Sequence, residues 1–202
     1  FSMFGTNSFN MVWEKVCAEV LDNQLQKPIG GLRLPVPLAE QYHDMRYKKL
    51  IDLIDKPQWS GTAPNGEPFV KQAEDTLIPD LISIVNVDGH CQFIIFDAKY
   101  YNIQLEHNKK LRGQPGIESI TKQYLYQLVY QPFVDAHQIG TVKNCFLMPT
   151  EMSEIIEKGS VSLAMMKRLG LEDIQVRLLP AKTVFTHYLK NTKLDIQDLN
   201  LR

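Results

Sequence analysis

Residues 79–99 read PDLISIVNVDGHCQFIIFDAK, and this stretch decides the fold of the chain. Apolar and β-branched residues dominate residues 81–87 and 91–96, which is the composition of buried strands. Asp88-Gly89 lies between the two runs and is a strong signal for a tight turn. The stretch therefore predicts a β-hairpin whose second strand ends at residues 97–99.

Charged side chains stand at the open end of this hairpin. Side chains alternate between the two faces of a strand, so Asp97 and Lys99 point the same way. The hairpin can also bring Asp80, at the start of its first strand, beside Asp97 near the end of the second. Charges at the end of a buried strand are costly unless they are paired or used.

These three residues have the chemistry for metal-assisted phosphodiester hydrolysis. Two adjacent carboxylates can bind a hard divalent cation through oxygen. A lysine beside them can orient a water molecule or stabilise negative charge on a phosphate. The alternative is that Asp97 and Lys99 form an ordinary ion pair at the end of a strand.

The rest of the chain predicts an α/β fold, with a mixed β-sheet flanked by helices. Apolar periodicity predicts helices over residues 9–25 and 38–54, and the glycines and prolines of residues 56–76 indicate an irregular loop. The later predicted elements are a helix over 118–130, a strand over 142–148, a helical stretch over 151–169, a strand over 174–179 and a helix over 183–190.

Composition limits the classes of protein that this chain can be. Its 202 residues are enough for one domain, and 44% hydrophobic with 22% charged residues is typical of a folded domain. The formal net charge of -1 excludes a general polycation. Cys17, Cys91 and Cys145 are odd in number and widely spaced, so we expect free thiols in the reducing cytoplasm. No apolar run is long enough for a membrane helix.

Pro79-Asp80 followed by Asp97-Ala98-Lys99 resembles the PD-(D/E)xK nuclease superfamily, with Asp as the second acid. Further stretches resemble the LlaJI-type restriction endonucleases, and together the resemblance covers most of residues 4–150. These stretches are FGTNSF at residues 4–9, VWE at 12–14, DAKYY at 97–101 and KQYLY at 122–126. The resemblance implies a restriction-endonuclease-like fold and Mg²⁺-dependent cleavage of double-stranded DNA in bacterial defence, with Mn²⁺ able to substitute.

The resemblance also implies partners and alternatives. We expect residues 1–202 to form a single nuclease domain of a larger protein or complex, since the chain opens at Phe1 rather than Met. A separate specificity domain or a McrB-like GTPase subunit can supply target recognition, and a homodimer is a further option. The alternative functions are a structure-specific resolvase or repair nuclease, and a catalytically inactive DNA-binding module with the same fold.

Further site residues follow from the resemblance. Such nucleases often use an acid from the first core helix, here Glu14, with Glu19 as the alternative. They often place a Gln or Lys on the helix after the DxK strand, for which Gln123 is the first choice, ahead of Lys122 and Gln127. The expected catalytic residues are Asp80, Asp97, Lys99, Glu14 and Gln123, and the expected metal ligands are Asp80, Asp97 and Glu14.

A basic cluster follows the DxK strand directly. Lys109, Lys110 and Arg112 can contact the phosphate backbone of DNA, as can Lys122 on the next helix. The alternative for the cluster is a solvated loop without a partner. Acidic residues in a metal site offset basic residues that face phosphates, so a net charge near zero is compatible with a DNA-cleaving domain.

Overall fold

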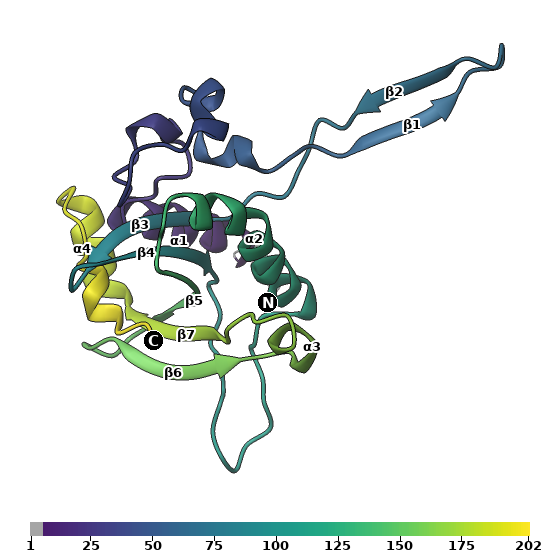
Figure 1. Ribbon diagram of the computed structural model, residues 1–202. Helices are drawn as coiled ribbons and strands as arrows, with labels where there is room; N and C mark the ends of the chain where they lie inside the picture. Colours follow the sequence, from purple (N-terminus) through teal and green to yellow (C-terminus); the bar gives the residue numbers. More distant parts are fainter. Residues whose placement is uncertain (1–5) are drawn as a thin grey trace.

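A five-stranded mixed sheet forms the centre of the computed structural model, which describes residues 6–202 (Figure 1). Its strands are β3 (Leu81–Val87), β4 (His90–Ala98), β5 (Thr141–Thr150), β6 (Ile156–Val161) and β7 (Ile174–Pro180). The strand order is β3-β4-β5-β7-β6. The two edge strands pair antiparallel with their neighbours, whereas β4–β5 and β5–β7 are parallel. The α/β prediction and the hairpin of residues 81–99 are confirmed.

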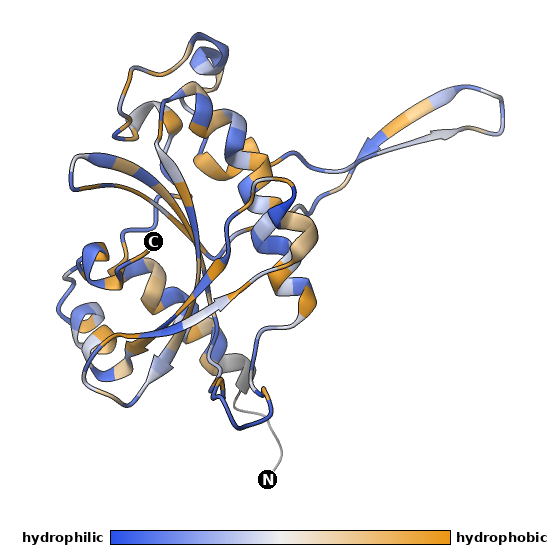
Figure 2. Cartoon of the chain, turned by 60° about the horizontal axis from the view of Figure 1, so that its bottom comes forward, coloured by the Kyte–Doolittle hydropathy of each residue, from blue (hydrophilic) through white to orange (hydrophobic). Residues whose placement is uncertain are grey.

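Helices cover both faces of this sheet. On one face, α1 (Thr6–Val20) and α4 (Ala181–Leu189) pack through Trp13 and Val184 against Phe96 and Leu147. On the other face lies α2 (Ile117–Ala136), which buries Tyr124 and other aromatic residues against the sheet. Figure 2 shows hydrophobic residues along the strands and on the helices that pack against them. No helix within residues 6–202 is long and apolar enough to cross a membrane.

The predicted helix over residues 38–54 is wrong. The segment contains two short 3-10 helices, η2 (Glu40–Met45) and η3 (Leu50–Leu53), after an earlier one, η1 (Ile29–Gly31). Its backbone makes only short-range hydrogen bonds of the 3-10 type within the segment and also bonds to an earlier part of the chain, since the Ile51 N–H donates to the Leu25 carbonyl oxygen. Apolar side chains of this segment pack into the α2 side of the core, and that burial produces a helix-like spacing.

The predicted irregular loop over residues 56–76 is also wrong. It forms an antiparallel two-stranded ribbon of β1 (Gln58–Thr62) and β2 (Pro68–Gln72), separate from the main sheet. The glycine and proline of residues 64–66 form the turn of the ribbon rather than a general break in structure. Figure 1 shows the ribbon extending well away from the rest of the molecule.

The predicted helical stretch over residues 151–169 is a strand followed by one helical turn. Strand β6 pairs antiparallel with β7, and α3 (Ala164–Lys167) follows it. The register shifts between Glu157 and Gly159. Gly159 has a backbone φ of 137°, which residues other than glycine rarely adopt. Because β6 is an exposed edge strand with a bulge, it lacks the apolar run that marks a buried strand.

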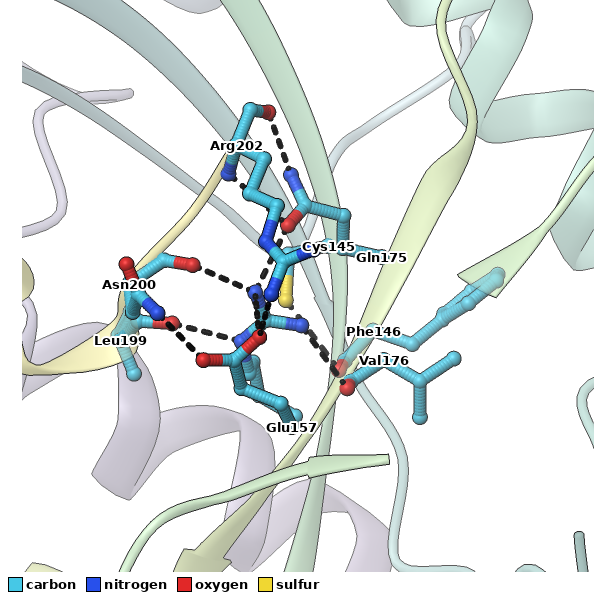
Figure 3. Close-up of polar contacts among 9 residues, drawn as sticks. Cys145, Phe146, Glu157, Gln175, Val176, Leu199, Asn200 and Arg202 are labelled. Atoms are coloured by element: carbon cyan, nitrogen blue, oxygen red, sulfur yellow. Dashed lines mark hydrogen bonds and ion pairs between the residues drawn. The ribbon is translucent and has the colours of Figure 1, made fainter. Parts of the chain in front are cut away.

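The C-terminal segment is fixed to the sheet by Arg177, a residue that is only 2% exposed. Its guanidinium donates to the carbonyl oxygens of Leu199 and Asn200, both at 2.6 Å, and to Gln175 Oε1 at 2.8 Å. Glu157 lies 3.6 Å from the same guanidinium. Figure 3 shows Glu157, Gln175 and Asn200 converging at this point. The short helix η4 (Ile196–Leu199) is thereby held against β7.

We expect Arg177→Met to lower the free energy of unfolding by about 3 kcal/mol, because several buried acceptors lose their donor. Urea denaturation measures the change. The control is Arg168→Met, at an exposed position, which should leave the midpoint unchanged. Equal stability of both variants would show that the Arg177 contacts do not hold the C-terminal segment.

Candidate active site

The β3–β4 register brings the predicted acids and lysine together. Leu81 pairs with Phe96, so Asp80 and Asp97 stand next to this pair on adjacent strands. Lys99 Nζ lies 2.5 Å from Asp97 Oδ1 and 3.7 Å from Asp80 Oδ2. All three side chains keep a small exposed fraction, between 10% and 21%. The two carboxylates and the ammonium therefore form one cluster that solvent can reach.

The backbone around this cluster is held on three sides. The Ala98 N–H donates to Asp80 Oδ2 at 2.9 Å, which ties the start of β3 to the end of β4. The Lys99 N–H donates to the Leu147 carbonyl oxygen, which continues the β4–β5 pairing beyond β4. Trp13 Nε1 donates to that same carbonyl from the α1 face. The side chains at 97 and 99 thus project from a fixed strand end.

The pKa of Asp80 is raised from 3.8 to about 7, with burial as the largest cause. The charge of Asp97 contributes to this rise, whereas the charge of Lys99 and the Ala98 N–H oppose it. For Lys99, burial lowers the pKa, but Asp97 and Asp80 together outweigh burial and raise it. Without a cation, the site therefore keeps Lys99 charged and Asp80 partly protonated near neutral pH.

Glu14 interacts electrostatically with this cluster. Burial raises the pKa of Glu14, with Lys99 lowering it and Asp97 raising it, so the carboxyl lies within range of both charges. Within residues 6–202, no three His, Cys, Asp or Glu side chains are close enough together to form a metal site. The structure thus brings Asp80 and Asp97 together without adding Glu14 as a third carboxylate. The role of Glu14 stays a prediction, as does that of Glu19.

Helix α2 places three predicted residues in different environments. Gln123 is completely buried, and neither amide atom has a hydrogen-bond partner among the described residues. Gln127 Oε1 accepts a hydrogen bond from Asn144 Nδ2 at 2.8 Å, which is a contact within the core. Lys122 Nζ lies 2.6 Å from Glu118 Oε1 on the helix surface. Only Gln123 therefore has unused hydrogen-bonding groups toward the interior.

The basic cluster lies on the exposed loop between β4 and α2, which leaves the sheet at the Lys99 end (Figure 1). Gln104 pairs with Arg112 across the loop as a short β-bridge. Lys109 lies 2.7 Å from Glu106, which offsets part of its charge. The loop is thus folded back on itself and attached directly to the cluster of Asp80, Asp97 and Lys99.

Comparison with known proteins assigns the chain to a family. Residues 39–184, more than half of the chain, match the family described as LlaJI restriction endonuclease. The chain belongs to the LlaJI restriction endonuclease family. This confirms the resemblance to the LlaJI-type restriction endonucleases. Glu14 lies outside the matched range, and residues 4 and 5 of the opening stretch lie outside the described residues.

A curated relative extends the match to nearly the whole chain. The chain is 31% identical over 200 residues to the YdjA component of the Type II restriction enzyme BsuMI of Bacillus subtilis (strain 168). The alignment covers 98% of this chain and 36% of the relative, so the chain spans about a third of that protein's length. No solved structure matches the chain. The family and the relative both support a nuclease of a restriction system.

Two residues of this LlaJI family domain position the cluster without having been predicted to do so. The Tyr126 hydroxyl donates to the Ile78 carbonyl oxygen at 2.8 Å, two residues before Asp80. The pKa of Tyr126 is raised to about 12, mainly by burial and in part by the charges of Asp80 and Asp97. Asn23 Oδ1 accepts a hydrogen bond from the Ile82 N–H, which fixes the start of strand β3. In the sequence, the spacing of Tyr126 three residues after Gln123 on the same helix is the signal that could have indicated its position near the site. No sequence signal indicates Asn23.

The raised pKa of Asp80 predicts a dependence of stability on pH. Between about pH 4 and 7 the folded chain binds a proton that the unfolded chain has lost, so this group's contribution falls as pH rises through 7. Asp80→Asn removes the carboxyl. In EDTA, the free energy of unfolding of the variant, taken relative to that of the unmodified chain, should therefore rise as the pH is raised from 4 to 8.

Urea denaturation at several pH values measures this difference. Asp88→Asn, at the exposed turn of the same hairpin, is the matched control. A constant difference between the Asp80→Asn chain and the unmodified chain across this range would mean that Asp80 titrates as it does in the unfolded state.

Proposed function

We propose that this chain is a Mg²⁺-dependent endonuclease that hydrolyses phosphodiester bonds of double-stranded DNA within a bacterial restriction system. The carrying observation is the cluster of Asp80, Asp97 and Lys99 at the open end of the β3–β4 hairpin. Membership of the LlaJI restriction endonuclease family supports the reaction class. The metal, the duplex substrate and the residue roles are parts of the proposal.

The donor set fits a magnesium ion. Mg²⁺ prefers oxygen ligands and commonly uses one or two protein carboxylates, with water and substrate phosphate completing its shell. Asp80 and Asp97 supply two such carboxylates. Asp97 Oδ1 is buried and, apart from its contact with Lys99, has no hydrogen-bond partner among the described residues. The ion, when bound, would polarise the phosphate and lower the pKa of a coordinated water.

The protein side chains have separate parts in this scheme. Asp80 gives up its proton when a cation binds, because ligation requires the ionised carboxylate. Lys99 is then free to turn from Asp97 toward the scissile phosphate, where its charge stabilises the negative charge that develops. Glu14 is the candidate for a third acidic group at the edge of the site, and Gln123 for a contact from α2. Mn²⁺ fits the same oxygen ligands.

Other parts of a restriction system complete the proposal. The chain spans about a third of its BsuMI relative, so further domains or subunits, such as a specificity domain or a McrB-like GTPase, would add target choice. A homodimer would place two sites on one duplex. The three cysteines are free thiols, which fits action in the cytoplasm.

Loss of the cluster should abolish cleavage while the fold remains. We expect Asp97→Asn and Lys99→Met each to reduce cleavage of duplex DNA in Mg²⁺ by roughly a hundredfold or more, because each removes a group that stabilises the transition state. Asp88→Asn is again the control, and EDTA should stop cleavage by every active variant. Circular dichroism checks the fold. Full activity of the Asp97→Asn and Lys99→Met chains would refute the proposed site.

The basic loop should supply the salt-dependent part of DNA affinity. If Lys109, Lys110 and Arg112 each neutralise a phosphate, replacing all three by Ala should reduce the slope of log K against log salt by about 2 to 3. Filter binding to a duplex in EDTA measures the slope. Lys190→Ala, on an exposed residue at the end of α4, is a control for loss of positive charge. An unchanged slope in the triple variant would place the loop away from DNA.

A further inference from the structure

The β1–β2 ribbon is an exposed feature that the cluster of Asp80, Asp97 and Lys99 does not explain. Every residue of its strands is exposed except Gly61, which is partly covered. Figures 1 and 2 both show it extending away from the sheet and helices. A two-stranded ribbon without further packing is only marginally stable in water, so an exposed ribbon of this kind calls for a functional explanation.

Contacts within the ribbon and at its base support its two strands. The Phe69 ring lies over Gly61, where an added Cβ would come within 2.7 Å of the ring, so a larger residue would require the Phe69 side chain to move. Lys71 Nζ lies 5.7 Å from the centre of the same ring. At the base, the Ala73 N–H donates to the Pro57 carbonyl oxygen and the Thr76 hydroxyl donates to that of Asp55. One face of the ribbon is thus used for its own packing.

The register defines the opposite face. Residues opposite each other on paired strands share a face. Gln58 pairs with Gln72, Ser60 with Val70, and Thr62 with Pro68. The other face carries the contacts of Phe69 with Gly61 and Lys71, together with Trp59, which is 70% exposed. We call the side presenting Gln58, Ser60, Thr62 and Gln72 the polar face. Its exposed side chains carry amide and hydroxyl groups, with Val70 between them at 65% exposure.

The polar face has the chemistry that reads base edges. The major groove of B-DNA is about 12 Å wide and admits a two-stranded ribbon, whose strands lie about 4.8 Å apart. Glutamine side chains pair with adenine, Ser and Thr hydroxyls bond to several bases, and an apolar side chain contacts the thymine methyl group. Two glutamines side by side with hydroxyls and one valine provide all three kinds of contact.

The ribbon is attached at the edge that carries the cluster of Asp80, Asp97 and Lys99. Seven residues, 73–79, join the end of β2 at Gln72 to Asp80. At about 3.6 Å for each residue this link reaches at most about 29 Å over its eight steps. A duplex that meets Asp80 therefore lies within reach of the ribbon.

The ribbon differs from the basic loop in its charge. Residues 56–76 contain Lys56 and Lys71 but three acids, Glu67, Glu74 and Asp75. Such a segment contributes little to phosphate affinity, which depends on cations. Its contribution to binding would be choice of sequence, while Lys109, Lys110 and Arg112 provide charge.

We propose that the β1–β2 ribbon lies in the major groove of the DNA substrate and that Gln58 and Gln72 contact base edges beside the cleavage site. This rests on the proposed function only in taking duplex DNA as the ligand. The ribbon is then a specificity element within the nuclease chain itself, acting alongside any separate specificity domain.

Selection from a library of duplexes with a randomised segment, bound to the full 202-residue chain in EDTA, tests this proposal. The test variant is Gln58→Ala with Gln72→Ala, and the matched control is Gln197→Ala, an exposed glutamine on η4. We expect the unmodified chain and the control to enrich the same base pairs. The double variant should lose roughly tenfold or more discrimination at one or more of them, with an unchanged salt slope.

Methylation of guanine N7 by dimethyl sulfate provides a second readout, because N7 lies in the major groove. The unmodified chain should protect guanines near the preferred bases, and the double variant should not. Binding is measured without metal, so loss of cleavage in Asp97→Asn and loss of base preference in the ribbon variant are separate results. The base preference of the ribbon can therefore be found even if the proposed metal chemistry is wrong.

Three outcomes would overturn the proposal. The first is no base preference or no DNA binding by the unmodified chain. The second is the same preference and the same protection in the double variant. The third is that Trp59→Ala changes the oligomeric state of the protein in solution, while neither Trp59→Ala nor the double glutamine variant changes DNA binding. That result would make the ribbon a protein interface.

Discussion

The site depends on the register of one β-hairpin. Asp80 and Asp97 are neighbours only because Leu81 pairs with Phe96, and a slip by one residue would turn one set of side chains to the opposite face of the sheet. The buried run Phe93–Phe96 and the parallel pairing of β4 with β5 fix that register. The strain of placing two carboxylates together is visible in the raised pKa of Asp80, which arises from burial and the nearby charge of Asp97. Lys99 relieves part of this strain, so the three groups form an electrostatic unit.

The sequence predicted the hairpin and its charged end because their signals are local. Asp88-Gly89, the apolar strands and the alternation that pairs Asp97 with Lys99 all lie within residues 79–99. The wrong predictions share a different physical cause. Residues 38–54 and 151–169 take their structure from distant partners, namely the backbone near Leu25 and strand β7, which no local periodicity reports.

The same limit applies within the site. Tyr126 holds the carbonyl of Ile78, and Asn23 fixes the start of β3, but each is separated from Asp80 by more than forty residues along the chain. Gln123 was predicted by resemblance, and its complete burial with unpaired amide atoms could not have been read from the helix pattern. The ribbon was mistaken for a loop because its strands have no core to face, and burial patterns are the main signal for strands.

The contacts around Asp80 and Asp97 bear on how the protein is made. The two acids are only seventeen positions apart, yet their surroundings use Trp13, Tyr126 and Leu147. A chain emerging from the ribosome therefore contains Trp13 and both acids well before Tyr126 and Leu147. Domains fold as units when enough of the chain has appeared. Strand β5 and helix α2 must be complete before the charged cluster has its final geometry, so an interrupted translation product would carry the motif without the assembled site.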